Sequence, residues 1–588
     1  MKSFFKYLLA SVLGVLLAGL IMFFIIIGGI GAMVSSQDQP VKVKAHTILH
    51  IKLDQPIMDR SNNSPFDNFD FASFVPTNQL GLNDILNNIK KAKTDPNIDG
   101  IYLDLTFIPT GIATIEEIRN ALIDFKESEK FIVSYSDTYT QASYYIASVS
   151  DKIYLNPEGL LTFVGLRSEI MFFKETLKKL GVEPQIIRHG KFKSAVEPFM
   201  YTKMSEANRL QVMTYMGSIW DQMLKGISEE RKMTIDQLNE LANKLALNNA
   251  QSAVDKGLVD ELKYKDEILT ELASLTDKKD SDKLESISLS KYTKVPNTKR
   301  KSLEKDKIAV IYASGNVIMG EGQEGTIGSD RISRAIRKAR KDSSVKAIVF
   351  RVNSGGGSAL ASEVIWREVK LAQEIKPVIA SLGDVAASGG YYIVAPAQKI
   401  IASPNTITGS IGVFGVLFNG KELLNKKLGV YVDVVKTNNF ADMGTFTRRL
   451  TAQEREVIQL SIEDIYSTFI SHVAEGRNMT TEEVDEIGQG RVWSGANALE
   501  NGLIDDFGGL DDAIKIAAEA ANIEKYRTVN YPKLKDPIEQ LLEDFQGNVR
   551  VSILKNELGD EYKYYNAVQN LKNLQGIQAR IPYEVEIY

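Results

Sequence analysis

The feature that most constrains the fold of this chain is an internal repeat at a shift of 247 residues. One ungapped register places Asp137 on Asp384 and the triplet Tyr-Tyr-Ile at 144–146 on the same triplet at 391–393. The same register aligns five further identical pairs, namely Ile85 with Ile332, Ile89 with Ile336, Ala92 with Ala339, Asp95 with Asp342 and Ile101 with Ile348. Solenoid repeats are far shorter, so the chain contains one domain twice.

Each copy alternates short apolar runs with segments of helical periodicity. In the second copy the apolar runs, which we interpret as buried strands, lie at 308–312, 347–352, 378–382 and 399–402. The segments between them, such as 329–341 and 361–375, have the periodicity of helices. Strands that are apolar throughout and alternate with helices favour a parallel sheet covered on both faces, so we predict an α/β fold.

The N-terminal end contains a long apolar segment. Residues 7–34 carry no charge, and this length can cross a hydrocarbon core of about 30 Å at 1.5 Å per residue. A cleaved signal peptide is the alternative, but its apolar region usually has 7–15 residues and ends at an A-x-A site. We predict a cytoplasmic head at 1–6, an uncleaved transmembrane anchor at 7–34, and a body on the extracytoplasmic side of the inner (plasma) membrane.

The repeat and the polar runs divide the remaining chain into domains. We expect an N-terminal repeat at 45–285 and a C-terminal repeat at 307–525. Residues 286–306 between them are assigned to a linker, because the run from 297 onward is polar and has no apolar face. The tail at 526–588 has no evident counterpart in the first copy.

Composition excludes several kinds of catalysis. The chain has no Cys and only 4 His, which excludes disulfides, thiolate zinc sites and cysteine nucleophiles and argues against multi-His metal sites. A net charge of -5 without a long basic block argues against nucleic acid as a partner. Any catalysis must therefore come from other groups, and we expect no metal and no cofactor.

The two copies differ in the segment after the second strand of each. In the second copy this segment contains three consecutive glycines, Gly355 to Gly357. Glycines permit positive φ and leave backbone N–H groups accessible, as an anion cradle or an oxyanion hole requires. The first copy has Pro109 in this segment and could not offer the same donors. A phosphate loop is the alternative, but the G-x-x-x-x-G-K-[ST] pattern is not present here.

A second difference lies after the next strand. Ser388 stands between two alanines and two glycines at a predicted strand-to-helix junction, where a serine can act as a nucleophile and the following N–H can hold an oxyanion. The first copy has Gln141 at this position, and Gln141 cannot do that work. From these residues alone, a small residue at a tight packing turn explains Ser388 equally well.

A base that could activate Ser388 is not evident among the histidines. Two histidines follow the apolar segment closely and two have no evident Asp partner; they are His46, His50, His189 and His472. A lysine can act instead if burial lowers its pKa from about 10.4. The segment 190–199 contains Lys193 among small and apolar residues, and the second copy has Ala441 in its place. Most lysines are solvated, so these residues alone leave Lys193 one candidate among many.

These motifs together resemble the signal peptide peptidase family SppA, or protease IV, in its long tandem-repeat form. The resemblance rests on the apolar N-terminus, the duplication, and the motifs RVNSGGGS at 351–358, AASGGYY at 386–392, TGSIGV at 408–413 and KFKSAVEPF at 191–199. It implies two ClpP/crotonase-like domains and a serine endopeptidase of hydrophobic peptides, notably cleaved signal peptides. Gly355 departs from the family pattern, which has Pro there; this change adds backbone freedom and removes no donor.

The family's functional residues can be carried over to matching positions of this sequence. The resemblance implies that Ser388 is the nucleophile, that Lys193 is the general base and that Ser410 orients the lysine amine. It also implies that Gly389 and Gly357 lend the N–H groups of the oxyanion hole. Each copy would then supply one half of the Ser/Lys dyad, and whether the halves meet within one chain or across two stays open.

The resemblance also bears on assembly and on rival functions. Single-domain relatives form rings that share sites between neighbours, so eight repeat units would here make a homotetramer with four sites. A crotonase-like acyl-CoA enzyme stays possible, because that fold also holds oxyanions with glycine-loop N–H groups, although an exported body argues against CoA. A non-catalytic membrane scaffold is the third possibility. The partners we expect are hydrophobic peptides and, through the anchor, the lipid membrane.

Overall fold

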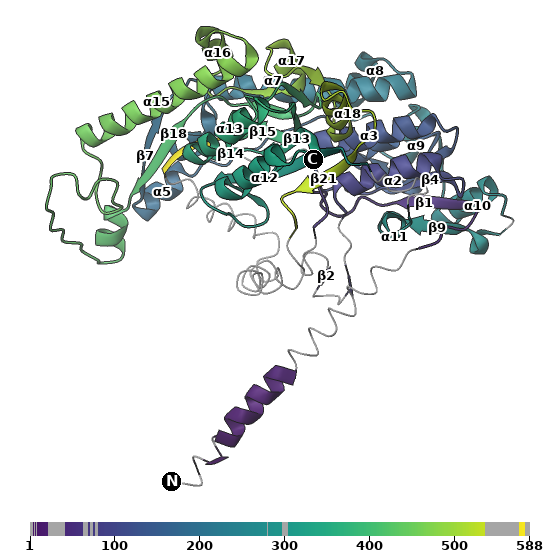
Figure 1. Cartoon of the computed structure of the whole chain (residues 1–588). Helices are drawn as coiled ribbons and strands as arrows, with labels where there is room; N and C mark the ends of the chain where they lie inside the picture. Colours follow the sequence, from purple (N-terminus) through teal and green to yellow (C-terminus); the bar gives the residue numbers. More distant parts are fainter. Residues whose placement is uncertain are drawn as a thin grey trace.

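The computed structural model describes residues 4, 6–7, 9–21, 41–62, 69–70, 75–76, 80–278, 280–296, 304–534 and 576–581. Residues 9–21 are helical and are drawn in purple near the N-terminus in Figure 1. In these ranges no helix is both long enough and apolar enough to cross a membrane. The predicted anchor at 7–34 falls in part on residues 22–34, which lie outside the described residues.

The first repeat is built on a six-stranded sheet whose strands are all parallel. In spatial order the strands are β8 (Glu261–Leu262), β6 (Lys152–Leu161), β5 (Phe131–Tyr139), β4 (Ile98–Asp104), β1 (Thr47–Ile51) and β9 (Glu285–Ser288). Its helices are α2 (Leu82–Thr94), α3 (Ile112–Lys126), α4 (Gln141–Ala147), α5 (Lys174–Leu180), α6 (Glu197–Met200), α7 (Glu206–Arg231), α8 (Ile235–Asn243), α9 (Ala250–Asp255), α10 (Lys265–Leu275) and α11 (Leu289–Thr293). This part of the chain confirms the predicted α/β fold.

The second repeat is built on an eight-stranded sheet that is parallel except at one edge. Its main path is β19 (Val492–Ser494), β17 (Ile407–Gly409), β15 (Val378–Ala387), β13 (Val345–Ser354), β10 (Lys307–Ser314) and β21 (Arg527–Tyr531). Off this path, β16 (Lys399–Ala402) pairs with β15, and β20 (Asp506–Phe507) pairs with β16. Its helices are α12 (Ser329–Lys341), α13 (Ala359–Gln373), α14 (Gly389–Tyr392), α15 (Ala452–Arg477), α16 (Thr481–Ile487), α17 (Gly495–Glu500) and α18 (Leu510–Ala520).

A third sheet joins the two repeats. Its strands, in order, are β12 (Thr326–Gly328), β11 (Asn316–Ile318), β14 (Gly356–Ser358), β22 (Gly576–Arg580), β18 (Phe414–Asn419) and β7 (Glu183–Arg188). Strand β7 belongs to the first repeat and pairs antiparallel with β18 of the second. Figure 1 shows this pair beneath α15, with β22 as a short yellow strand near β14. A separate short pair consists of β2 (Phe69–Asp70) and β3 (Val75–Pro76).

The repeat predicted from the sequence is visible in the elements themselves. Helices α2 and α12, and likewise α3 and α13, begin and end at positions that differ by the same 247 residues. Each repeat closes with a strand that pairs parallel to its own first strand, β9 with β1 and β21 with β10. The linker predicted to begin at residue 286 therefore begins later, because β9 and α11 are part of the first repeat. Strand β9 is also the counterpart of β21 in the first copy.

The two repeats meet at a buried ion cluster beside the glycine segment. Arg351 of β13 lies with its Nε 2.7 Å from Oδ1 of Asp59 and with one Nη 2.6 Å from Oε1 of Glu117. All three side chains are almost fully buried. Nearby, Asp384 accepts hydrogen bonds from the backbone N–H and the hydroxyl of Thr114. Carboxylates of the first repeat and an arginine of the second thus compensate each other where water is excluded.

Replacing this arginine should destabilise the protein strongly. Arg351→Met would leave two buried carboxylates without a cation, which costs about 3–5 kcal/mol. The measurement is the free energy of unfolding in urea, with Arg334→Met as a control, because Arg334 lies on the exposed side of α12. We expect the control to change stability by less than about 0.5 kcal/mol. A loss at Arg351 no larger than in the control would contradict this account.

Candidate active site

Ser388 lies at the turn between β15 and α14 in an unusual backbone conformation. Its φ is 56° and its ψ is -117°, a region that residues other than glycine rarely adopt. Its N–H donates to the carbonyl oxygen of Gly409 at 2.8 Å, which helps to hold the turn. Strained conformations of this kind gather at functional sites. Ser388 therefore lies where a strand-to-helix turn fixes its side chain.

Lys193 reaches Ser388 from the first repeat, from the segment that links β7 to the single turn Ser194–Val196. Its Nζ lies 2.9 Å from Oγ of Ser388 and 3.0 Å from both Oγ and the carbonyl oxygen of Ser410. All three residues are fully buried. The three side chains singled out by the family resemblance thus lie together within a single chain, in hydrogen-bonding contact.

Burial lowers the pKa of Lys193 well below its ordinary value of 10.5. Two glycines allow the backbone to close around this side chain. A Cβ added at Gly490 would lie 2.6 Å from Cβ of Lys193, and one added at Gly412 would lie 3.2 Å from its Cδ. The Phe414 ring, with its centroid 6.0 Å from Nζ, forms an apolar wall. This environment favours the neutral amine, the form that can accept a proton.

The segment that carries Lys193 is fixed to the second repeat. The N–H of Phe192 donates to the carbonyl oxygen of Gln489 at 2.9 Å. The side-chain amide of Gln211 donates to the carbonyl oxygen of Phe192 and to Oγ of Ser194, and it accepts from the N–H of Val492 at 3.1 Å. Sequence reasoning missed Gln211 and Gln489, because no spacing pattern links either residue to the lysine.

The glycine segment lies against the residue that follows Ser388. Gly356 has φ 98°, which favours glycine, and a Cβ there would lie 2.7 Å from the backbone nitrogen of Gly389. A Cβ at Gly389 would lie 3.1 Å from the backbone nitrogen of Gly357. The two N–H groups predicted to form an oxyanion hole therefore come close together beside Ser388, and side chains at these positions would separate them.

The corresponding site of the first repeat is filled. Gln141 is buried, and its Oε1 accepts hydrogen bonds from the N–H groups of Val164 and Gly165 at 2.8 and 2.7 Å. Phe163, at the position of Ser410, packs against Trp220 with ring centroids 5.3 Å apart. At the positions of Ser388 and Ser410, the first repeat thus has an amide bonded to the backbone and a packed aromatic ring.

The histidines lie elsewhere. His472 pairs with Glu363 at 3.0 Å and stacks on Trp366, and His189 stacks on Tyr466. His46 and His50 contact carboxylates of the first repeat. Across the described ranges, no hydrogen bond or ring contact joins a histidine to Ser388, Lys193 or Ser410. Among the described residues, the basic side chain in contact with this serine is therefore Lys193 and not a histidine.

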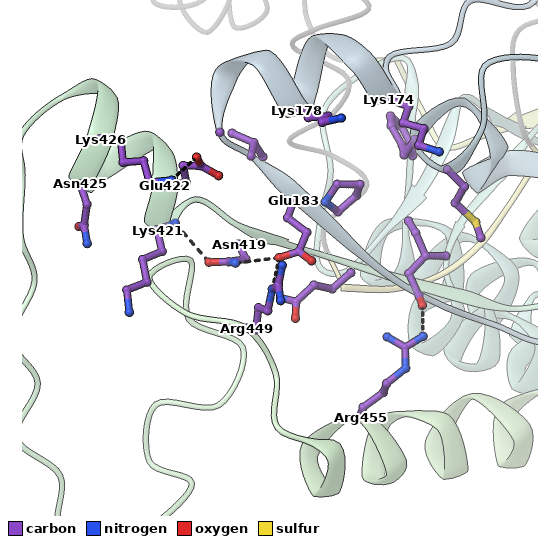
Figure 2. Close-up of a pocket in the computed structure, with 17 residues that line it drawn as sticks. Lys174, Lys178, Glu183, Asn419, Lys421, Glu422, Asn425, Lys426, Arg449 and Arg455 are labelled. Atoms are coloured by element: carbon purple, nitrogen blue, oxygen red, sulfur yellow. Dashed lines mark hydrogen bonds and ion pairs between the residues drawn. The ribbon is translucent and has the colours of Figure 1, made fainter.

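A cavity of about 820 Å³ opens between α5, the β7–β18 pair and the start of α15 (Figure 2). Its lining is rich in cationic side chains, namely Lys174, Lys178, Lys421, Lys426, Arg449 and Arg455. Glu183 at its centre accepts hydrogen bonds from Arg449 and from Asn419. Ser388, Lys193 and Ser410 do not line this cavity, so it is separate from the candidate active site.

A strained serine, in contact with a buried amine whose pKa is lowered and adjacent to backbone N–H donors, is the arrangement of a serine hydrolase. The sequence profile of Peptidase family S49 matches residues 124–279 and 370–524, one stretch in each repeat. The chain belongs to this family of serine peptidases.

Three relatives are similar to the chain over most of its length. Protease 4 of Haemophilus influenzae is 38% identical over 75% of this chain and 73% of its own, and Protease 4 of Salmonella typhi is 38% identical over 82% and 79%. The chloroplastic serine protease SPPA of Arabidopsis thaliana is 33% identical over 85% and 74%. A solved ClpP1 chain from Listeria monocytogenes aligns with 35% of this chain and 94% of its own, at 16% identity and a TM-score of 0.24.

Proposed function

We propose that the protein is a membrane-anchored serine endopeptidase that hydrolyses hydrophobic peptides, cleaved signal peptides among them, with Ser388 and Lys193 as a catalytic dyad. The observation that carries this proposal is the 2.9 Å contact between Oγ of Ser388 and the buried Nζ of Lys193. The substrate class follows from the resemblance of the motifs to the signal peptide peptidase family. Membership of a serine peptidase family favours peptide hydrolysis over acyl-CoA chemistry or a scaffold role.

The reaction is acyl transfer in two steps. Neutral Lys193 accepts the hydroxyl proton of Ser388 as Oγ attacks the carbonyl carbon of the peptide bond. The tetrahedral intermediate collapses, the C–N bond breaks, and the ammonium of Lys193 gives its proton to the leaving amine. Water then loses a proton to Lys193 and attacks the ester, which releases the second product and restores the hydroxyl of Ser388.

Three further residues assist this chemistry. Oγ and the carbonyl oxygen of Ser410, each 3.0 Å from Nζ, orient the amine so that one lone pair faces Ser388. The N–H groups of Gly357 and Gly389 stabilise the negative charge that develops on the carbonyl oxygen. Because the side chains of this site are buried, each such interaction is stronger than it would be in solution.

The proposal includes location and assembly. Residues 7–34 would anchor the protein in the inner, or plasma, membrane, with the catalytic body on the extracytoplasmic side.

Within one chain, β7 of the first repeat pairs with β18 of the second. By the repeat, the residues equivalent to β7 in the second copy are 431–436, and those equivalent to β18 in the first copy are 167–172. Neither segment belongs to a sheet in the part of the chain that the structure describes, and Val435 is 97% exposed. Pairing these segments between neighbouring chains would repeat the internal contact and close a ring, which we propose is a homotetramer with four sites.

The acyl-enzyme provides a direct test. A p-nitrophenyl ester of a short hydrophobic peptide should acylate Ser388, and acid quenching followed by mass spectrometry should find one acyl group per chain on that residue. Ser410 serves as an internal control and should stay unmodified, because its hydroxyl is predicted to orient the amine only. Acylation of another residue, or of none while the peptide is still hydrolysed, would contradict the dyad.

A further inference from the structure

Helix α3 of the first repeat, which the structure describes throughout, begins without a cap from its own side chains. Its N-cap residue is Gly111, and its first turn contains no acidic residue. The first N–H groups of a helix have no partner within the helix, so a buried helix end needs an acceptor from elsewhere. Here the acceptor is Asp384 of the second repeat. Its Oδ1 accepts from the N–H of Thr114 at 2.8 Å, and its Oδ2 accepts from the Thr114 hydroxyl at 2.7 Å.

The equivalent helix of the second repeat caps itself. Ser358 stands at the N-cap of α13, and its Oγ accepts from the N–H of Ala361 at 3.3 Å. In the 247-residue register, Ser358 occupies the position of Gly111. A Cβ added at Gly111 would lie 2.2 Å from Cγ of Asp384. The first repeat therefore lacks the local cap, and the space of the missing side chain is filled by a carboxylate of the other repeat.

Asp384 lies where β15 changes its register against β13. The two strands pair regularly as far as Leu382 and resume at Ala386, and over this interval β15 advances four residues while β13 advances two. Irregularities of this kind bend a strand and re-aim its side chains, and they are common beside active sites. Two residues beyond Ala386 the strand reaches Ser388. The direction in which β15 presents the serine is thus set at the point where Asp384 is held.

The two members of the candidate dyad come from different repeats. Lys193 belongs to the first and Ser388 to the second, and their side chains are 2.9 Å apart. This distance depends on how the repeats are held against each other. Asp384 precedes the serine by four residues on the same strand and is bonded to the first repeat, where Thr114 is almost fully buried. Hydrogen bonds to a carboxylate are stronger than those between neutral groups, so this contact is suited to fixing the distance.

Helix α3 also holds the strand that leads to the glycine segment. Glu117, three residues after Thr114, has its Oε1 2.6 Å from one Nη of Arg351 on β13. Its Oε2 accepts from the N–H of Leu510 at 2.8 Å. One helix of the first repeat therefore contacts both strands of the second repeat that end at the site. The contact at Asp384 is the one on the strand of the nucleophile.

We propose that Asp384 is a positioning residue of the reaction: by capping α3 of the first repeat from β15 of the second, it fixes Ser388 at the distance from Lys193 that proton transfer requires. Asp384 acts through the strand and not by contact with either reacting group. The inference rests on the proposed function, because it takes these two residues as the reacting pair. A displacement on the order of 1 Å costs about 100-fold in rate, which sets the size of the expected effect.

The first experiment measures kcat and KM of full-length variants on a short fluorogenic hydrophobic peptide. Asp384→Ala removes the cap and should lower kcat about 100-fold, with KM changed less than about threefold. Asp384→Asn keeps an oxygen that can accept from the N–H of Thr114, and asparagine caps helices as well as aspartate does, so its kcat should stay within about threefold of the wild type. A variant with asparagine as impaired as the one with alanine would overturn the proposal.

Thr234→Ala is the control for the loss of a helix cap. Thr234 is exposed and caps α8 of the first repeat by accepting from the N–H of Gln237. This change should lower the melting temperature by about 2–4 °C and leave kcat unchanged. A cap that serves stability alone would give the same result at Asp384. A folded Asp384→Ala protein with the kcat of this control would therefore overturn the positioning role.

The second experiment approaches the contact from the first repeat. Thr114→Val keeps the shape of the side chain and the backbone N–H but removes the hydroxyl, so it also serves if Asp384→Ala does not fold. We expect kcat to fall about tenfold. In the double variant the loss should equal that of Asp384→Ala alone, because both changes break one contact. Losses that multiply in the double variant would overturn the proposal.

These measurements separate the inference from the proposed function. A wild-type protein that does not hydrolyse the peptide would contradict the proposed function, and with it this inference. An active wild type, together with folded Asp384→Ala and Thr114→Val variants of equal kcat, would contradict the positioning role alone.

Discussion

Lys193→Met should abolish peptide hydrolysis and at the same time raise the thermal stability of the protein at neutral pH. Removing one member of a catalytic unit lowers kcat by roughly 10⁴-fold to 10⁶-fold. Met has a similar length and suits the buried, apolar surroundings of Lys193. The expected loss is therefore one of chemistry, because the fold keeps a side chain that fills the same space.

The gain in stability follows from the lowered pKa of Lys193. The unfolded chain binds a proton at this lysine at any pH below about 10.5, whereas the folded protein keeps it neutral at pH values above its lowered pKa. Between these two pKa values the unfolded state binds more protons, so stability due to this group rises with pH. The lysine therefore costs stability at pH 7, and this cost disappears as the pH approaches 10.5.

The measurement is the melting temperature of both proteins at pH 7 and near pH 10, together with kcat. The increase in melting temperature caused by Lys193→Met should be larger at pH 7 than near pH 10. At both pH values it is reduced by a small loss, because the hydroxyls of Ser388 and Ser410 no longer have the amine as a partner. Lys191→Met is the control, since Lys191 is exposed and should change neither quantity. Activity within tenfold of the wild type, or an advantage that grows with pH, would contradict the role given to Lys193.

The elements of the repeats could be predicted because their signals are local. Helix α12 has the bounds expected from its periodicity, and α15 begins with a capping box formed by Thr451 and Glu454, a pattern that is also local in the sequence. The position of Ser388 after its strand followed from the same local pattern. Ser388 and Lys193 stand out because the two copies differ at these positions. The equivalent residues, Gln141 and Ala441, cannot perform the same chemistry.

The surroundings of these residues could not be predicted from local patterns. Gln211 lies on the long helix α7, and only the fold reveals that its amide joins Phe192 to Val492. In the sequence, Gly490 cannot be distinguished from other turn glycines. Only the structure reveals that its backbone lies against Lys193. Such contacts join residues that are hundreds of positions apart, and a single sequence contains no periodicity that links them.

The strands at the ends of the repeats were missed for a related reason. Strands β9 and β21 are short and follow polar segments, so the sequence gives no apolar run that separates them from a linker or a tail. They become strands because β1 and β10 each leave an edge that accepts a parallel partner. Strand β22 is the hardest of these strands to predict from the sequence, because its two partner strands come from different parts of the second repeat.

Ser388→Ala should lower kcat for peptide hydrolysis by roughly 10⁴-fold to 10⁶-fold while the protein still binds peptides. The methyl group cannot form an acyl-enzyme, but the N–H groups of Gly357 and Gly389 are unaffected. Stability should change little, since alanine at φ 56° is strained as serine is. The measurements are kcat, peptide binding by fluorescence anisotropy, and the free energy of unfolding.

Ser388→Gly provides the matched comparison, because it removes the same hydroxyl and also the cause of the strain. Glycine adopts positive φ readily, so this variant should be as inactive as Ser388→Ala but more stable than it by about 1 kcal/mol. A glycine variant no more stable than the alanine variant would show that the turn costs nothing. Residual turnover in both variants, above roughly one hundredth of the wild type, would show that another group performs the attack. Together the two variants separate the hydroxyl, which carries the chemistry, from the turn that presents it to Lys193.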